Sequence, residues 1–282
     1  MTRAAAIARA VVLLMVMTAG ACASPPAVIE IVSLDRPTAA AGQRHARYAA
    51  DVAAIATAFE TALRLPRIEV PVVLFPTRRA LERGLLEVGY TERLARTASA
   101  FDAIGGSRAV LVNAQVVDRF DRTRRVRLLA HELVHTMQYG FAGGTRGASE
   151  QWLREGFAEW VACRVAAHLR LASFDSLKDD VLAPAGQLAL GTPPTPLEQI
   201  STFAQWAEAQ ARGRALYAQA FLGAELLIQQ HGVPAVVHYF ELFRTTKDRH
   251  RAFVDAFGVE LRTFEGMLAR RWHQTIGHLR AR

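Results

Sequence analysis

The sequence of 282 residues predicts an α+β protein, with a small mixed sheet in an N-terminal lobe and a mainly helical C-terminal lobe. Two observations support this class. The first half contains short runs rich in β-branched and apolar residues, which are typical of strands. Apolar residues at three- and four-residue spacing, typical of helices, surround these runs and continue from residue 197 to the C-terminus. A composition that is 51% hydrophobic and 21% charged is ordinary for a globular protein.

The N-terminal lobe is predicted to begin with a helix over 43–65, which Pro66 ends. A strand is predicted over 68–75, and Pro71 within it indicates an edge or bulge position, because proline cannot donate to the ladder. A second helix over 78–88 begins at Thr77, a good helix cap, and a short strand follows at Ala109, Val110, Leu111 and Val112.

Two helices are predicted to complete this lobe. The first contains the periodic run 126–139 and begins at Asp121 or Thr123. The second begins at Ser149, again as a cap, and extends to about residue 171. The C-terminal lobe is predicted to be helical throughout, with breaks at Gly213, at residues 232–234 and at Gly258.

The first residues have the pattern of a targeting segment, in which Arg3 and Arg9 precede an apolar run too short to span a bilayer. The small residues before Cys22 resemble a bacterial lipobox, which places a lipid anchor on the Cys22 sulfur. The alternative is ordinary secretion, with cleavage after an Ala-x-Ala site at 21–23. We therefore expect export, and we favour a lipoprotein on the periplasmic face of the membrane over a soluble secreted protein.

Composition divides the chain into five predicted segments. They are a signal peptide (1–22), a tether rich in Pro, Ala, Ser and Gly (23–42), the N-terminal lobe (43–171), an irregular surface connection (172–196) and the C-terminal lobe (197–282). Cys163 is the one cysteine besides Cys22, so no structural disulfide is expected, and its apolar neighbours predict a buried position. The net charge of +8 comes from scattered arginines without interleaved aromatic residues, and no nucleic-acid partner is predicted.

The sequence His131-Glu132-Leu133-Val134-His135 lies within the helix predicted around 126–139. Residues four apart share a helix face, so the two imidazoles can bind one metal ion. Glu132 lies near that face and can act on a water molecule. A hydrolytic zinc site needs a third protein ligand and one open position, and Glu155, on the next predicted helix, is the natural candidate. Glu159 lies one turn later and is expected to accept from the outer N–H of His131 or His135.

The HELVH sequence, followed by WLREGFAEW at 152–160, resembles the gluzincin branch of the zinc metallopeptidases. The wider context is similar to the catalytic core of aminopeptidase N and to bacterial lipoprotein-like members. The resemblance implies a zincin-like fold, one Zn²⁺ held by His131, His135 and Glu155, and Glu132 as general base. It also implies that Tyr217 hydrogen-bonds the oxyanion of the tetrahedral intermediate.

One feature of the aminopeptidases is missing, the Gly-x-Met-Glu-Asn motif that reads the free amine of the substrate. We therefore favour an endopeptidase, acting on a peptide or protein substrate, over an aminopeptidase. The strand 109–112 is then expected to hold an extended substrate by backbone pairing. A non-catalytic zinc-stabilised scaffold of the cell envelope is the alternative, although a structural site would not need Glu132. Self-processing, or specificity for a single envelope protein, also stays open.

Overall fold

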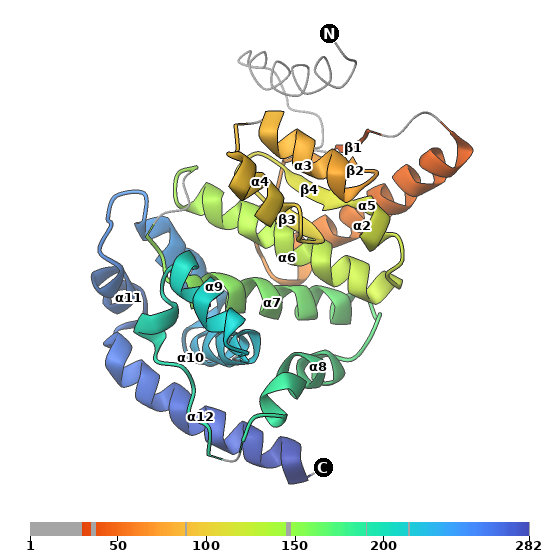
Figure 1. The fold of residues 1–282 in the computed structure, drawn as a ribbon. Helices are drawn as coiled ribbons and strands as arrows, with labels where there is room; N and C mark the ends of the chain where they lie inside the picture. Colours follow the sequence, from red (N-terminus) through yellow and green to blue (C-terminus); the bar gives the residue numbers. More distant parts are fainter. Residues whose placement is uncertain are drawn as a thin grey trace.

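The computed structural model describes residues 30–34, 38–87, 89–144, 148–189, 191–213 and 215–281. The predicted signal peptide with Cys22, and residues 23–29 of the predicted tether, lie outside these residues. The α+β class is confirmed: a small sheet lies at one end of the molecule and layers of helices extend from it (Figure 1). In the described ranges, no helix has the length and hydropathy needed to cross a bilayer.

The sheet has four strands in the order β1-β2-β4-β3. Strands β1 (Ile31–Ser33), β2 (Val72–Phe75) and β4 (Val110–Asn113) are parallel, and β3 (Ala103–Gly105) pairs antiparallel with β4 at the edge. The prediction of a tether was wrong for residues 31–33, whose backbone pairs with β2, and for residues 39–42, which begin the next helix. The edge prediction for β2 was also wrong. Pro71 precedes the strand, where its carbonyl accepts from the Val110 N–H at 3.0 Å, so the ladder loses no donor.

The alternating side chains of β2 separate two cores. Val73 and Phe75 pack on α3 (Arg78–Glu87) and α4 (Glu92–Ala98), whereas Val72 and Leu74 join the main core with α2 (Ala39–Ala62) and α6 (Arg122–Phe141). Figure 1 shows α3 and α4 on one side of the sheet and α6 on the other. The predicted cap of α3 is present, since the Ala80 N–H donates to Thr77 Oγ1 at 3.1 Å.

Helix α7 (Gln151–His168) lies between α6 and α10 (Leu216–Leu242). Gly156 permits this packing, because a Cβ there would lie 2.0 Å from the Ala220 carbonyl oxygen. Of the two predicted caps for α6, the structure has Asp121, which accepts from the Arg124 N–H at 2.8 Å. The predicted cap of α7 was wrong: α7 begins after Glu150, and the Ser149 hydroxyl accepts from Arg154 Nη1 instead.

The C-terminal part is helical, as predicted, and contains η1 (Leu197–Ile200), α9 (Phe203–Ala211), α10, α11 (Arg249–Phe257) and α12 (Leu261–Ala281). The breaks predicted at Gly213, Gly232 and Gly258 are present as positive φ angles of 70°, 81° and 66°. A small helix, α5 (Ala114–Val117), follows β4.

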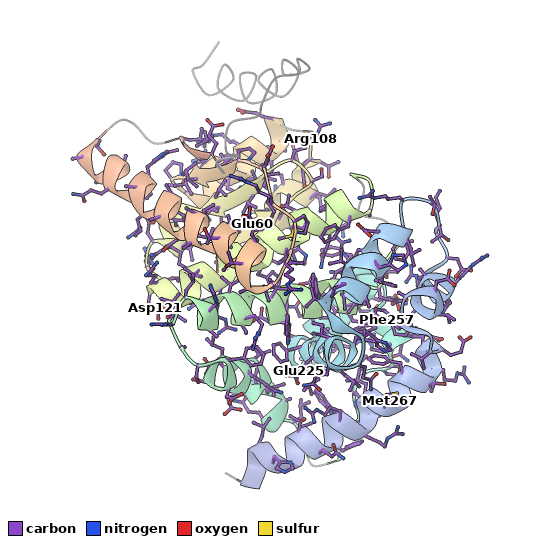
Figure 2. All side chains as sticks on the ribbon, turned by 180° about the vertical axis from the view of Figure 1, so that it is seen from behind. Glu60, Arg108, Asp121, Glu225, Phe257 and Met267 are labelled. Carbon is purple, nitrogen blue, oxygen red and sulfur yellow. The ribbon has the colours of Figure 1, made fainter. Side chains whose placement is uncertain are left out.

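The predicted irregular connection was wrong for residues 174–186, which form α8 (Phe174–Gly186). Ser173 caps this helix, and its buried residues Leu177, Val181 and Ala185 recur at four-residue steps, a helical pattern that the charged residues between them obscure. Lys178 of α8 also contacts Glu225 of α10 through Oε1 at 2.7 Å, and Figure 2 labels Glu225 within the helical lobe. Buried apolar residues from β1 to α12 form one cluster, so the two predicted lobes share a core.

Candidate metal centre

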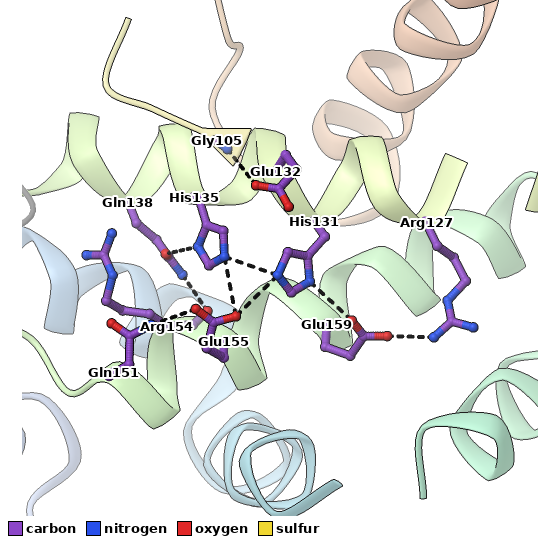
Figure 3. A network of polar contacts seen from close by, with 10 residues as sticks. All are labelled: Gly105, Arg127, His131, Glu132, His135, Gln138, Gln151, Arg154, Glu155 and Glu159. Atoms are coloured by element: carbon purple, nitrogen blue, oxygen red, sulfur yellow. Dashed lines mark hydrogen bonds and ion pairs between the residues drawn. The ribbon is translucent and has the colours of Figure 1, made fainter. Parts of the chain in front are cut away.

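The two central helices bring His131, His135 and Glu155 together (Figure 3). His131 and His135 are one turn apart on α6, and Glu155 is in the second turn of α7. His131 Nε2 and His135 Nε2 are 3.1 Å apart, and Glu155 Oε2 lies 3.4 Å and 3.5 Å from these two atoms. The three side chains predicted as ligands therefore present one atom each to a single point.

The geometry of this triangle suits a zinc ion. Tetrahedral zinc has bonds of about 2.0–2.1 Å to nitrogen and oxygen, so any two of its ligand atoms lie about 3.3–3.4 Å apart. The observed separations of 3.1, 3.4 and 3.5 Å match that spacing. Two imidazoles and a carboxylate are also a donor set that zinc prefers, and three protein ligands leave a fourth position for water or substrate.

The outer atoms of each ligand are held by neighbouring side chains (Figure 3). His131 Nδ1 lies 3.1 Å from Glu159 Oε2, the contact expected for this glutamate, and Arg127 donates to Glu159 Oε1 at 2.5 Å. His135 Nδ1 lies 2.9 Å from Gln138 Oε1. Gln151 donates to Glu155 Oε1 at 2.6 Å, which leaves Oε2 to face the histidines.

These contacts set the tautomers of both histidines. The Gln138 amide nitrogen donates to the Arg154 carbonyl at 2.9 Å, so the amide oxygen of Gln138 accepts from Nδ1–H of His135. Glu159 is an acceptor and requires Nδ1–H on His131 in the same way. In the neutral rings both Nε2 atoms then carry lone pairs, directed at each other and at a carboxylate oxygen. Such a group of acceptors can be bridged by a cation.

The electrostatics of these side chains favour positive charge between the histidines and the glutamates. Burial disfavours the charged form of His131, but hydrogen bonds to Glu155 and Glu159 outweigh it and raise the pKa of His131 well above its usual value. Burial also disfavours ionised Glu155 and Glu159, yet the neighbouring histidines, together with Arg127 at Glu159, lower both pKa values. The pKa of Glu159 falls to about 2. Both carboxylates are therefore ionised at neutral pH.

Glu132 is next to the ligand triangle without belonging to it. Its Oε2 accepts from the Gly105 N–H of β3 at 2.5 Å, which holds the carboxylate between α6 and the edge strand. A side chain at position 105 would displace this contact, since a Cβ there would lie 2.2 Å from the Glu132 carbonyl oxygen. Burial raises the pKa of Glu132 despite the opposing effect of the histidines and of the Gly105 N–H, as suits a group that takes up a proton.

A cleft of about 430 Å³ opens beside the centre, and His131, Glu132, Glu159 and Tyr217 are among the residues that line it. Tyr217 is in the first turn of α10, with its ring centroid 6.4 Å from that of His131 and an edge contact to Trp206. Its side chain is 38% exposed. Partial burial, then the nearby carboxylates Glu155 and Glu132, raise the pKa of Tyr217, so the phenol stays protonated and can donate a hydrogen bond.

The predicted substrate strand was wrong. Residues 110–112 belong to β4, which has β2 on one side and β3 on the other, so both of its edges are already paired. Ala109, just before β4, uses its carbonyl to accept from the Gly106 N–H. The strand at the cleft is β3, whose residue Ala103 lines it. Three residues are too short for a periodic strand signal, which is why β3 did not emerge from the sequence.

Two further residues were missed, Gln138 and Gln151. Their spacing could have indicated them: Gln138 follows His135 by three residues and Gln151 precedes Glu155 by four, so each shares a helix face with the ligand that it contacts.

Comparisons of this chain with protein families, with curated proteins and with solved structures found no match.

Proposed function

We propose that this chain is a zinc-dependent peptide-bond hydrolase of the gluzincin type, with a zincin-like fold, exported to the bacterial cell envelope. The observation that carries the proposal is the ligand triangle of His131, His135 and Glu155 at tetrahedral spacing, with Glu132 beside it and a cleft in front of it. A purely structural zinc site closes its fourth position with a protein ligand and needs no buried glutamate next to the metal.

In this proposal the three ligands hold one Zn²⁺, which when bound acidifies a water molecule and polarises the scissile carbonyl. Glu132 takes the proton of the attacking water and later gives it to the departing amine. Tyr217 donates to the oxyanion that forms on the carbonyl oxygen. Removing one such donor commonly costs about 10²–10³ in rate, which Tyr217→Phe should reproduce.

The outer edge of β3 is the natural place for an extended substrate. Among the described strands β3 pairs only with β4, and its residue Ala103 lines the cleft. A peptide added to this edge would run past Glu132 and the metal ligands, with main-chain hydrogen bonds that require no free terminus. This arrangement, together with the missing amine-reading motif, favours an endopeptidase over an aminopeptidase.

The test is the Glu132→Gln variant of the full chain, compared with the wild type on a casein substrate. Wild-type protein loaded with zinc should cleave casein, lose activity with a chelator and regain it with added zinc. Glu132→Gln should retain about one zinc per chain and show no cleavage. Wild-type rates in this variant would contradict the assigned base. Stoichiometric zinc without turnover by the wild type, on casein and on peptide libraries, would favour the scaffold alternative.

A further inference from the structure

Besides His131, Glu132 and Glu159, three charged side chains line the cleft. They are Arg124, Arg127 and Asp102. Arg127 is already paired, because its guanidinium donates to Glu159. Among the residues that the structure describes, Arg124 has no carboxylate within ion-pair distance of its side chain. Arg124 is therefore the cation of the cleft that remains available to a bound molecule.

The orientation of Arg124 is restrained. Its guanidinium carbon lies 3.7 Å from the centroid of the Phe120 ring, one turn earlier in the chain, and Phe120 also lines the cleft. A guanidinium stacked on an aromatic face keeps the N–H groups at its edge free, and these groups match the two oxygens of a carboxylate. The stacked pair is thus arranged to receive a planar anion at the wall of the cleft.

The position of Arg124 on α6 relates it to the metal centre. Arg124, Leu128 and His131 are spaced at i, i+4 and i+7, so they lie on one face of the helix, and all three line the cleft. Seven residues of helix correspond to about 10 Å along the axis. An extended peptide covers about 3.3 Å per residue, so this distance corresponds to about three residues of substrate. Leu128, between the two, provides an apolar wall.

We propose that Arg124, stacked on Phe120, forms a carboxylate-binding subsite, so that the preferred substrate carries a carboxylate about three residues from the bond that is cleaved. This inference rests on the proposed peptidase function and adds a substrate class to it. Asp102 precedes β3 and also lines the cleft, so it would repel a carboxylate held near that strand. The carboxylate is either an acidic side chain or the free C-terminus of a peptide.

Binding of defined peptides distinguishes an acidic side chain from a free C-terminus as the source of the carboxylate. The probes are fluorescein-labelled Ala/Leu octapeptides with one Glu, or Gln in its place, at successive positions, each made with an amidated and with a free C-terminus. They are titrated by fluorescence anisotropy into zinc-loaded full-length Glu132→Gln protein, which retains the bound peptide. The same background carries Arg124→Gln, or the matched control Arg119→Gln, which removes an exposed arginine that does not line the cleft.

At low salt we expect about two- to fivefold tighter binding of the best carboxylate peptide than of its neutral partner, the range for an ion pair with a solvent-accessible arginine. Arg124→Gln should abolish this preference, whereas Arg119→Gln should retain it. A preference for internal Glu in amidated peptides identifies a side-chain carboxylate, and a preference for the free acid over the amide identifies the C-terminus. No preference in the parent protein, or an equal preference in Arg124→Gln, would overturn the proposal.

The same peptides, incubated with protein that retains Glu132, distinguish this inference from the proposed function. Cleavage without any dependence on the carboxylate or on Arg124 refutes the subsite and leaves the peptidase in place. Arg124-dependent binding without cleavage of any peptide supports the subsite and counts against the peptidase.

Discussion

The contact between Glu159 and His131 should contribute measurably to zinc affinity. Glu159 accepts from Nδ1 of His131 at 3.1 Å and is itself held by Arg127 at 2.5 Å. With a pKa of about 2, the carboxylate is ionised wherever zinc can bind, so it orients the imidazole and increases the basicity of its Nε2. Replacing such a partner typically weakens metal affinity about 10–100-fold, or about 1.4–2.7 kcal/mol.

Two variants of Glu159 separate the contribution of its charge to zinc affinity from that of its hydrogen bond. In Glu159→Gln the amide oxygen can still accept from His131, but the negative charge is lost and the Arg127 guanidinium is left without its counter-ion. We expect about a tenfold weaker affinity. In Glu159→Ala both the hydrogen bond and the charge are absent, and the loss should approach about 100-fold.

The assay is zinc competition against a chromophoric chelator at pH 7.5, which does not depend on enzymatic activity. The matched control is Glu208→Gln on α9, where an exposed glutamate pairs, among the described residues, only with Arg212 at the end of that helix. This control should bind zinc as the wild type does, and far-UV circular dichroism should show that all variants are folded. Zinc affinities within twofold of the wild type for both Glu159 variants would refute the reasoning.

Two further predictions concern packing and burial. Gly156→Ala should destabilise the fold by about 1–3 kcal/mol or more, because the new Cβ would meet the backbone of α10. Gly42→Ala on α2 should instead stabilise the fold by about 0.5–1 kcal/mol, because a Cβ there has nothing within 4 Å. Thermal melting of the two variants measures this contrast, and equal shifts would contradict the close packing of α7 on α10. In a Cys22→Ser background, the Cys163 thiol should not react with maleimide at pH 8 until guanidinium unfolds the chain. The reason is that burial, and then the charge of Glu159, raise the pKa of this thiol to about 12. Rapid labelling of the native protein would show that Cys163 is accessible.

The helices with strong periodicity and the short strand β4 were predicted well, whereas β1, β3 and α8 were not. The helix that bears His131 and His135 and the helix that bears Glu155 both follow from local apolar spacing and are present as α6 and α7. Strands β1 and β3 have three residues each, too few to produce a two-residue alternation that can be recognised. Their existence depends on backbone partners far away in the chain, as with residues 31–33 and 72–74.

The sequence by itself determined which side chains can meet at a metal. A helical repeat of 3.6 residues puts His131 and His135 on one face, and the same repeat puts Glu155 and Glu159 on one face of the next helix. These relations are local, so they hold wherever the two helices are placed.

Only the tertiary structure decided what surrounds those side chains. It assigned Glu159 to His131 and to Arg127, Gln138 to His135, and the Gly105 N–H to Glu132. It also paired both edges of β4, which moves the proposed substrate edge to β3, and among the described residues it paired Arg127 with Glu159 but gave Arg124 no carboxylate. Most of these contacts join residues 27 or more positions apart, and they arise from the packing of α6 against both α7 and the sheet. No local pattern encodes such packing, because it depends on how separate elements share one core.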